Sequence, residues 1–204
     1  MYVPRHFAED RHDVVLALVR AAGYGHLVVA TDDGFESTPI PFVVDDDLTA
    51  VRAHVARPNP IWKLAPCDAL LVVAVGDAYV SPNWYPSKAE HGKVVPTWNY
   101  EVVHLHGRLV AHDDAEWVAR QIRDLTDTNE APLPTPWAVD DVPDDYVATT
   151  QRGIVGVAVD VVRFEAKRKL SQNRSEDDIA GTIAGLRSVG DGGAAAVADA
   201  MARR

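Results

Sequence analysis

Near its start the chain carries apolar residues at helical spacing. Spacings of three and four residues place side chains on one face of a helix. The residues that recur in this way are Val14, Val15, Leu18, Val19 and Ala22. Gly23 follows the last of them, and glycine ends helices readily because it adopts the left-handed conformation without steric cost. The pattern predicts a helix over about residues 8–22.

The middle of the chain shows the alternation and turn residues of β-strands instead. Asp32-Asp33-Gly34 is a hairpin turn signal between two such runs. Pro39 and Pro41 cannot donate to a ladder, so their strand should lie at an edge or face a ligand. Ala69–Val80 is apolar on both faces, which predicts a buried central strand. The predicted strands are Leu27–Ala30, Glu36–Val44, Leu48–Arg57, Ala69–Val80, Thr97–Arg108 and Ile154–Glu165.

Helical signals return after residue 112. Asp113 with Glu116 three residues later resembles a capping box. Ser175 followed by three acidic residues is another helix start, because acidic side chains favour the first turn. The later predicted elements are a helix from Asp113 to about Thr126, a proline-rich loop over Thr128–Pro143, a short helix near Asp144–Arg152 and a helix after Ser175 that breaks at Gly190–Gly193.

Strands in hairpin order, with helices at the ends and in one insertion, predict a mainly antiparallel α+β fold, a β-barrel with flanking helices. A parallel doubly wound sheet would need strands that alternate with helices, and this alternation is absent. The predicted organisation is a barrel domain over residues 1–174, with a helical insertion around 113–152, and a C-terminal helical segment over 175–204.

Composition narrows the class of protein. A chain of 204 residues can form one domain with a sizeable core, and no apolar run approaches the roughly 20 residues that span a bilayer. The start lacks the basic-then-apolar pattern of a signal peptide. Cys67 is the single cysteine, which excludes an intrachain disulfide, and its place before a buried strand favours burial over nucleophilic use. We therefore expect a cytoplasmic protein.

The charge is acidic overall, with one basic exception. Thirty acidic and 20 basic residues give a formal net charge of −10, which argues against sequence-independent nucleic-acid binding. In one short segment the basic residues outnumber the acidic ones, and Glu165 is its single acidic residue. It is either a solvated basic face or a site for a small phosphate-bearing ligand. The cations of this basic segment are Arg163, Lys167, Arg168, Lys169 and Arg174.

The stretch Tyr79–Gly107 concentrates aromatic and histidine residues around a polar loop, Pro86–Val94. In an extended strand, successive side chains point to opposite faces. The residues that should share one face are Trp98, Tyr100, Val102, His104 and His106. Such a wall suits a planar ligand. His104 and His106 have a spacing that can chelate a metal, but no third ligand is fixed nearby, so a hydrogen-bonding or packing role is favoured.

A second candidate lies at the end of the third predicted strand. Pro58 holds Arg57 extended, and a rigid arginine fork suits a phosphate or a carboxylate; the alternative is a surface arginine. The chain has no GxGxxG, GxxxxGK[ST] or GxSxG sequence, so a Rossmann, P-loop or α/β-hydrolase site has no support.

Five sequence strings together resemble one family. They are MYVPRHF at residues 1–7, HVARPNPIW at 54–62, YVSPNWY at 79–85, VPTWNYEVVHLHG at 95–107 and KRKLSQN at 167–173. The chain resembles the PaiB-type FMN-binding negative transcriptional regulators, in register from residue 1 to about 188. The resemblance implies a split-barrel flavin-binding fold and a homodimer with FMN near the subunit interface.

The resemblance also implies cofactor-binding residues. Arg57, Asn59 and Trp62 come from the second string; Thr38 and Pro39 are placed by strand order alone. The residues that come from the fourth and fifth strings are Trp98, Asn99, Tyr100, Lys169, Ser171, Gln172 and Asn173.

The sequence and the resemblance leave three functions open. The first is a PaiB-like flavoprotein that regulates transcription indirectly, since direct DNA reading is not expected.

The second function is an FMN-dependent oxidoreductase of the split-barrel type. The third is a heme-dependent enzyme, because some relatives are heme enzymes that form a nitrogen–nitrogen bond in making piperazate. That branch reads HMNRANPHW and PTWNF where this chain has HVARPNPIW and PTWNY. The departure favours FMN over heme b. With heme, His54 or His104 would be the axial ligand.

Overall fold

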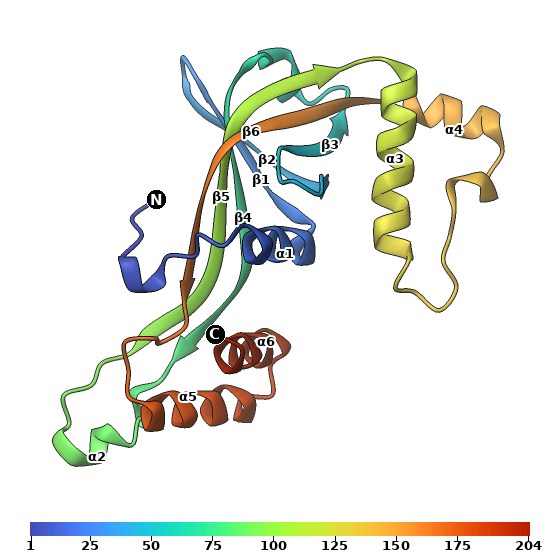
Figure 1. Cartoon of the computed structure of the whole chain (residues 1–204). Helices are drawn as coiled ribbons and strands as arrows, with labels where there is room; N and C mark the ends of the chain where they lie inside the picture. Colours follow the sequence, from blue (N-terminus) through green and yellow to red (C-terminus); the bar gives the residue numbers. More distant parts are fainter. The chain divides into compact units, whose positions relative to one another are not determined.

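Six antiparallel strands of the computed structural model, which describes residues 1–204, close into a barrel in the order β1-β2-β3-β6-β5-β4 (Figure 1). This confirms the predicted fold class. The strands are β1 (Tyr24–Thr31), β2 (Gly34–Val44), β3 (Ala50–Ala56), β4 (Cys67–Val80), β5 (Thr97–His112) and β6 (Ile154–Lys169).

Six α-helices and four short 3-10 helices complete the chain. The α-helices are α1 (His12–Ala22), α2 (Ser87–His91), α3 (Ala115–Glu130), α4 (Asp144–Gln151), α5 (Glu176–Ser188) and α6 (Gly192–Ala202). The 3-10 helices are η1 (Arg5–Phe7), η2 (Pro60–Leu64), η3 (Pro82–Trp84) and η4 (Val139–Asp141). None of the helices is both long enough and apolar enough to cross a membrane.

The chain divides into two compact units. The terminal unit comprises Met1–Val15, Ala74–Val103 and Glu165–Arg204, and the central unit comprises Leu16–Val73 and His104–Phe164. The strands β4, β5 and β6 each contribute residues to both units. The predicted boundary at residue 174 remains a prediction.

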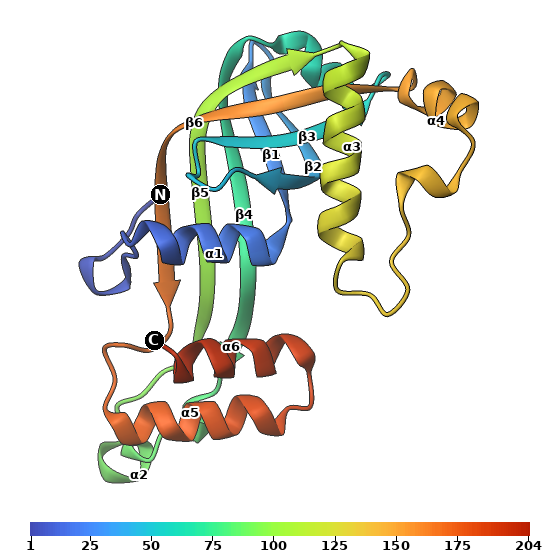
Figure 2. The same ribbon diagram turned by 45° about the vertical axis from the view of Figure 1, so that its right-hand side comes forward.

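The terminal unit has a helical core, in which α5 and α6 lie side by side (Figure 2). Leu170, Ile179 and Met201 are fully or almost fully buried there, and Trp84 packs against them. Gly185 makes room for the Trp84 ring, because a Cβ at that position would lie 2.2 Å from Cδ2 of the indole. Ser175 caps α5 by accepting from the Asp178 amide, as its sequence predicts.

The central unit is built on the β1–β2 hairpin and on β3, which pairs with both β2 and β6. Helix α3 packs against β2 and β3. Gly156 leaves space for Trp117 of α3, because a Cβ there would lie 2.2 Å from Cζ3 of the ring. The Trp117 ring also stacks on His112 with centroids 4.2 Å apart. Gln121 is fully buried and donates to the Arg52 carbonyl at 3.1 Å.

The strand that carries Pro39 and Pro41 is not an edge strand, since β2 lies between β1 and β3, but its proline segment pairs on one side only. Both residues pair with β1, whereas β3 pairs only with Phe42–Val44 of β2. The proline segment of β2 is therefore an edge within an otherwise closed barrel. Closed barrels leave few edges, and the prolines occupy a position where no second ladder needs their missing amide.

Other expectations need correction. Ala69–Val80 is not buried on both faces: Leu71 and Val73 are fully buried while Leu70 and Val72 are partly exposed, because only one face of a barrel strand points inward. The first helix begins at His12, since Ala8 pairs with Lys167 of β6. Asp114, not Asp113, caps α3, and accepts from the Trp117 amide at 2.8 Å.

Candidate functional site

The sequence-predicted site residues fall into two groups, one in each unit. The terminal unit holds Trp98, Asn99, Tyr100, Lys169, Ser171, Gln172 and Asn173, and the central unit holds Thr38, Pro39, Arg57, Asn59 and Trp62. Each group is described by itself.

The end of β6 carries cations that lack acidic partners. The strand continues to Lys169, four residues beyond the predicted end, so Lys167 and Lys169 share one face. Lys167 is 9% exposed; its Nζ donates to the Tyr2 carbonyl at 3.3 Å and lies 5.2 Å from the Tyr100 ring centroid. Arg174 follows, with its guanidinium 4.6 Å from the Tyr85 ring centroid. We call Lys167, Lys169 and Arg174 the cationic cluster.

The three charges of the cationic cluster repel one another. The pKa of Lys169 is lowered, chiefly because burial removes water from its ammonium group and then because Lys167 and Arg174 add positive charge nearby. Lys169 donates to the Thr97 hydroxyl and to the Trp98 carbonyl, both uncharged. Buried charges are normally paired, so this arrangement is suited to an anion such as a phosphate.

An aromatic wall lies on β4 and β5 of the same unit. We use this name for Tyr79, Trp98 and Tyr100. The Tyr79 and Trp98 rings meet edge to face with centroids 6.0 Å apart, and both side chains are about half exposed. Tyr100 lies within cation–π distance of both Lys167 and Lys169. The predicted alternation is confirmed, because Asn99 and Glu101 on the opposite face are buried.

Three predicted residues shape the turn after β6. Asn99 is fully buried and donates to the Ser171 hydroxyl at 2.9 Å. Ser171 has a left-handed backbone, with φ of 64°. Gln172 donates to the Arg168 carbonyl at 2.6 Å and accepts from the Leu170 amide at 2.8 Å. These bonds fix the turn that joins Lys169 to Arg174, while Asn173 is exposed.

Arg168 lies on the opposite face of β6 from Lys167 and Lys169. Its guanidinium donates to Glu101 at 2.6 Å and to Glu9 at 3.4 Å, and all three side chains are largely buried. Glu9 also accepts from Arg11, and this hydrogen bond, with Arg168, lowers the pKa of Glu9 to about 2. Arg168 is therefore paired with carboxylates on one face of β6, whereas Lys167 and Lys169 on the other face have no carboxylate partner.

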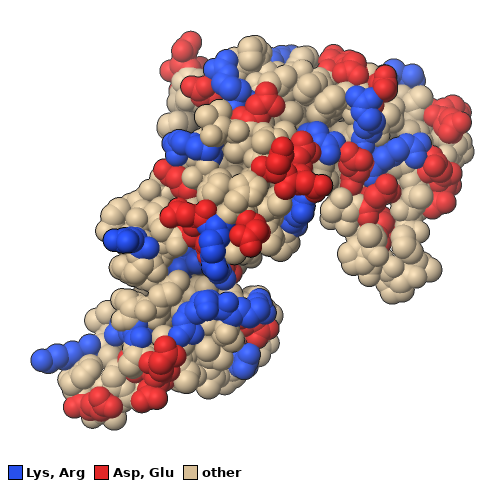
Figure 3. Space-filling model, in the orientation of Figure 1, with Lys and Arg blue, Asp and Glu red and all other residues tan.

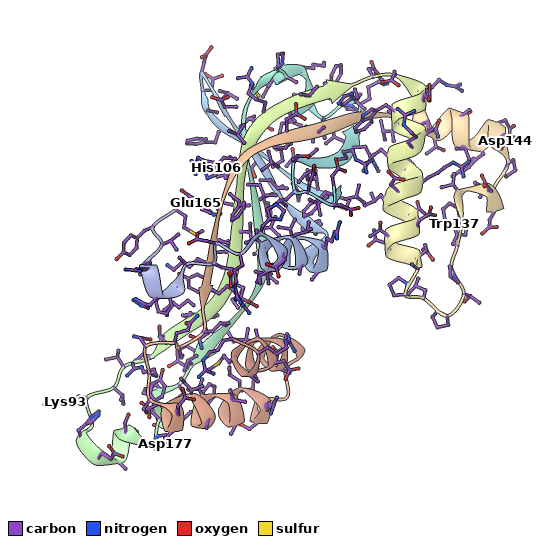
Figure 4. The ribbon with its side chains drawn as sticks, viewed as in Figure 1. Lys93, His106, Trp137, Asp144, Glu165 and Asp177 are labelled. Atoms are coloured by element: carbon purple, nitrogen blue, oxygen red, sulfur yellow. The ribbon has the colours of Figure 1, made fainter.

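The predicted loop Pro86–Val94 contains the short helix α2, which α5 anchors. Asp178 is buried and accepts from both the amide and the hydroxyl of Ser87, at 3.1 and 2.8 Å. Beyond α2, Gly92 has a φ of 64° and the chain is exposed at Lys93. Figure 4 shows Lys93 next to α2 and Asp177 at the start of α5. The loop is thus held at one end and exposed at the other.

In the central unit, the Arg57 guanidinium already has hydrogen-bond partners within the protein. Its guanidinium donates to both oxygens of Asp113 at 2.9 and 2.6 Å, and to the Arg152 and Ile154 carbonyls at 2.8 and 3.1 Å. The hydrogen bond from Arg57 lowers the pKa of Asp113. Trp62 donates its indole N–H to the Arg57 carbonyl at 3.0 Å. To hold a phosphate, Arg57 would have to exchange Asp113 for it.

The remaining residues of this group form a small hydrogen-bonded set. Asn59 donates to the Thr38 hydroxyl at 3.1 Å and accepts from the Ile61 amide at 3.0 Å, which caps η2. Pro39 follows Thr38 on the edge segment of β2. His54 on β3 has a buried Nδ1 with no hydrogen-bond partner, and burial lowers the pKa of its imidazole.

Sequence reasoning missed several contributors. The Tyr2 ring centroid lies 5.7 Å from Nζ of Lys167. The sequence shows Lys167 and Arg174 as basic residues but does not assign them to the cofactor site. Continuing the alternation of β6 past Glu165 would have placed Lys167 beside Lys169. Tyr85, which is buried under Arg174, has no signal in the sequence that links it to the cations.

The surface shows where the charge lies outside these sites. On the face drawn in Figure 3, acidic and basic side chains are interspersed within each unit. That face has no continuous basic surface of the kind that a nucleic-acid backbone requires.

The fold and the cation-lined aromatic wall define an antiparallel split-barrel protein with features suited to a planar anionic ligand. Solved structures share this fold. The flavocytochrome Anf3 from Azotobacter vinelandii is 18% identical with a TM-score of 0.58, over 88% of this chain and 78% of that chain. The FAD and heme binding protein from Mycobacterium smegmatis is 15% identical with a TM-score of 0.59, over 85% and 78%.

Sequence relatives establish the family. The family described as "Putative FMN-binding domain" matches residues 1–163. Protease synthase and sporulation protein PAI 2 from Bacillus subtilis is 30% identical over 206 residues, covering 98% of this chain and 96% of that protein. The chain belongs to this PaiB-type FMN-binding family.

Proposed function

We propose that this protein is a flavoprotein that binds FMN in the terminal unit. The observation that carries the proposal is the buried, acid-free Lys167 in a cationic cluster beside an exposed aromatic wall. A flavin mononucleotide combines a phosphate dianion with a large planar ring, and these are the two chemistries that the cluster and the wall accommodate. Membership of a family with an FMN-binding domain supports the same ligand.

The residues have distinct parts in this proposal. Lys169 and Arg174 bind the phosphate, and Lys167 adds charge behind them. Trp98 and Tyr79 pack against the ring. Asn99 and Ser171 hold the turn that presents the cations. When bound, the flavin supplies hydride or electron transfer, while the protein supplies position and electrostatics. We propose a homodimer with the cofactor near the interface, in which the partner covers the exposed part of the aromatic wall.

We propose a regulatory role that does not depend on direct DNA reading. The net charge of −10 disfavours binding to a phosphate backbone. The relative from Bacillus subtilis is named for protease synthesis and sporulation, which fits an effect on gene expression through a partner protein or through the redox state of the flavin. The single cysteine fits action in the cytoplasm. A gel-shift at low salt with the upstream region of its own gene tests this; binding with a clear salt slope would contradict it.

A flavin-dependent oxidoreductase is the second candidate. The half-exposed Trp98 and Tyr79 leave room for a substrate to approach a ring that lies on them. Oxidation of NADH or NADPH by the FMN-loaded protein would support it, and complete inertness would leave a binding protein. Heme is the third, since two neighbours bind it by name and His54 has an unpartnered buried nitrogen.

An absorption spectrum of the purified protein, with and without added cofactor, tests the proposal. Flavin gives bands at roughly 370 and 450 nm, and heme an intense band at roughly 400 nm. Titration with FMN and with riboflavin then tests the phosphate site, because riboflavin has the same ring but no phosphate. We expect FMN to bind at least tenfold more tightly. Equal affinities would mean that the cationic cluster does not hold the phosphate, and absence of binding by either would overturn the flavin assignment.

A further inference from the structure

The central unit contains a cavity that two arginines line, separate from the residues assigned to flavin. Its volume is about 310 Å³, and it lies where β4, β5 and β6 come together. Its lining residues are Asp68, Ala69, His106, Gly107, Arg108, Val162 and Arg163. None of them belongs to the predicted cofactor-binding set. The volume is at the lower end of the range for small-molecule sites.

Two arginines on neighbouring strands supply the charge. Arg108 of β5 donates to Asp68 at 2.9 Å, and the Asp68 side chain is 91% exposed. Such an exposed ion pair contributes little, so an incoming anion can compete with Asp68 for the guanidinium. Nη2 of Arg163, on β6, lies 3.1 Å from Nδ1 of His106. The lining of the cavity thus includes two guanidinium groups, an imidazole and the Asp68 carboxylate.

The backbone at Gly107 brings these groups together. A Cβ on Gly107 would lie 2.1 Å from the carbonyl oxygen of Asp160, so no other residue fits between β5 and β6 at this point. Gly107 precedes Arg108 on β5 and lies close to β6, and Arg163 of β6 lines the same cavity. Guanidinium forks held in this way match the oxygens of a phosphoryl group.

Apolar surface lies beside the charges. Val162 is 76% exposed, and Ala69 also lines the cavity. An inorganic ion would not use this surface, whereas the organic part of a phosphate ester would. We propose that this cavity binds a small phosphomonoester, with the phosphoryl group between Arg108 and Arg163 and the organic group against Val162.

One isotope-labelling scheme gives one signal from this cavity and one from a control position. The dipeptide His-Gly occurs at His91–Gly92 and at His106–Gly107. Protein labelled with carbonyl-¹³C histidine and ¹⁵N glycine therefore gives two filtered amide signals. Gly107 lies in the cavity, and Gly92, which belongs to the terminal unit, is the internal control. The probes are inorganic phosphate and phenyl phosphate, each compared with sodium chloride at the same ionic strength.

We expect the Gly107 signal to move in a saturable way with both probes while Gly92 moves less, and phenyl phosphate to bind more tightly. Arg163→Gln should weaken the affinity for both probes, measured from the Gly107 signal, at least tenfold. Arg120→Gln, an equal loss of charge at an exposed pair with Glu116 on α3, should leave it unchanged. A Gly107 signal that does not respond, or that responds equally in Arg163→Gln, would overturn the proposal; equal affinity for the two probes would overturn the ester assignment.

Discussion

In the central unit Arg57 is held by Asp113 and two carbonyls, whereas in the terminal unit Lys167, Lys169 and Arg174 have no carboxylate partner. Both regions were expected to hold a phosphate. A cation that is already paired stabilises the protein around it, and a ligand must displace the partner before it can bind. An unpaired, partly buried cation carries a cost that a ligand removes. The comparison therefore separates a cation that holds the protein together from cations that are ready for an anion.

The largest effect is expected at Arg168, the paired neighbour of the cluster lysines. Arg168→Gln should lower the free energy of unfolding by about 3 kcal/mol, because it removes the cation that pairs with the buried carboxylate of Glu101 and one of the two cations that pair with Glu9. Urea unfolding measures the change. Lys93→Gln, an exposed lysine of the same unit, serves as the control for loss of one charge. A change as small as that of the control would contradict the structural role of Arg168.

The next effect is expected at Lys169, and it should appear in ligand affinity rather than in stability. Lys169→Gln should weaken FMN binding by about 1.5–3 kcal/mol, roughly 10- to 150-fold, the scale for charged hydrogen bonds. Its melting temperature should stay the same or rise, since the substitution removes repulsion from Lys167 and Arg174. Fluorescence titration measures the affinity, again with Lys93→Gln as control. A lower melting temperature with unchanged affinity would reverse the assignment.

A smaller effect is expected at Arg57. Arg57→Gln should lower the melting temperature by a few degrees at most, because the Asp113 pair is exposed, and should leave FMN affinity close to that of the wild type. The same two measurements used for Lys169 apply here. A loss of FMN affinity equal to that of Lys169→Gln would show that Arg57 leaves Asp113 to bind the phosphate, and would erase the contrast between the regions.

The smallest effect concerns pH. Because the pKa of Glu9 is about 2 in the folded protein against an ordinary 4.5, the stability that Glu9 contributes is complete above pH 4.5. It is lost as the pH falls from 4.5 toward about 2. The unfolding free energies at pH 6 and pH 3 should therefore differ less in Glu9→Gln than in the wild type. An equal difference in the two proteins would mean that other carboxylates dominate the acid response.

Much of the fold could be predicted, because alternation and turn residues are local signals. The hairpin at Asp32–Gly34 and the cap at Ser175 both follow from such signals and agree with the structure. The prediction that Ala69–Val80 is buried on both faces was wrong, because an apolar sequence does not say which face of a barrel strand points outward. The start of the first helix was also wrong, because Ala8 is claimed by a partner 159 residues away in the sequence, Lys167.

The candidate site could be predicted only in part. The aromatic alternation around Trp98 and Tyr100 and the basic character of Lys169 were visible in the sequence. The state of each cation was not, because it depends on partners that are distant along the chain. Arg57 meets Asp113 and Arg168 meets Glu9 and Glu101 only after the strands have paired. A basic residue in a sequence does not reveal whether its charge is already matched.

The last residues of β6 place opposite requirements on adjacent positions. Arg168 is fixed by two acids on one side of the strand, while Lys167 and Lys169 face the other side. Substitutions at 167 and 169 can accumulate as ligand preference changes, whereas a change at 168 must be matched at Glu9 or Glu101. Related sequences should therefore vary in a two-residue rhythm here, and a single inserted residue before Lys167 would exchange the two roles at once.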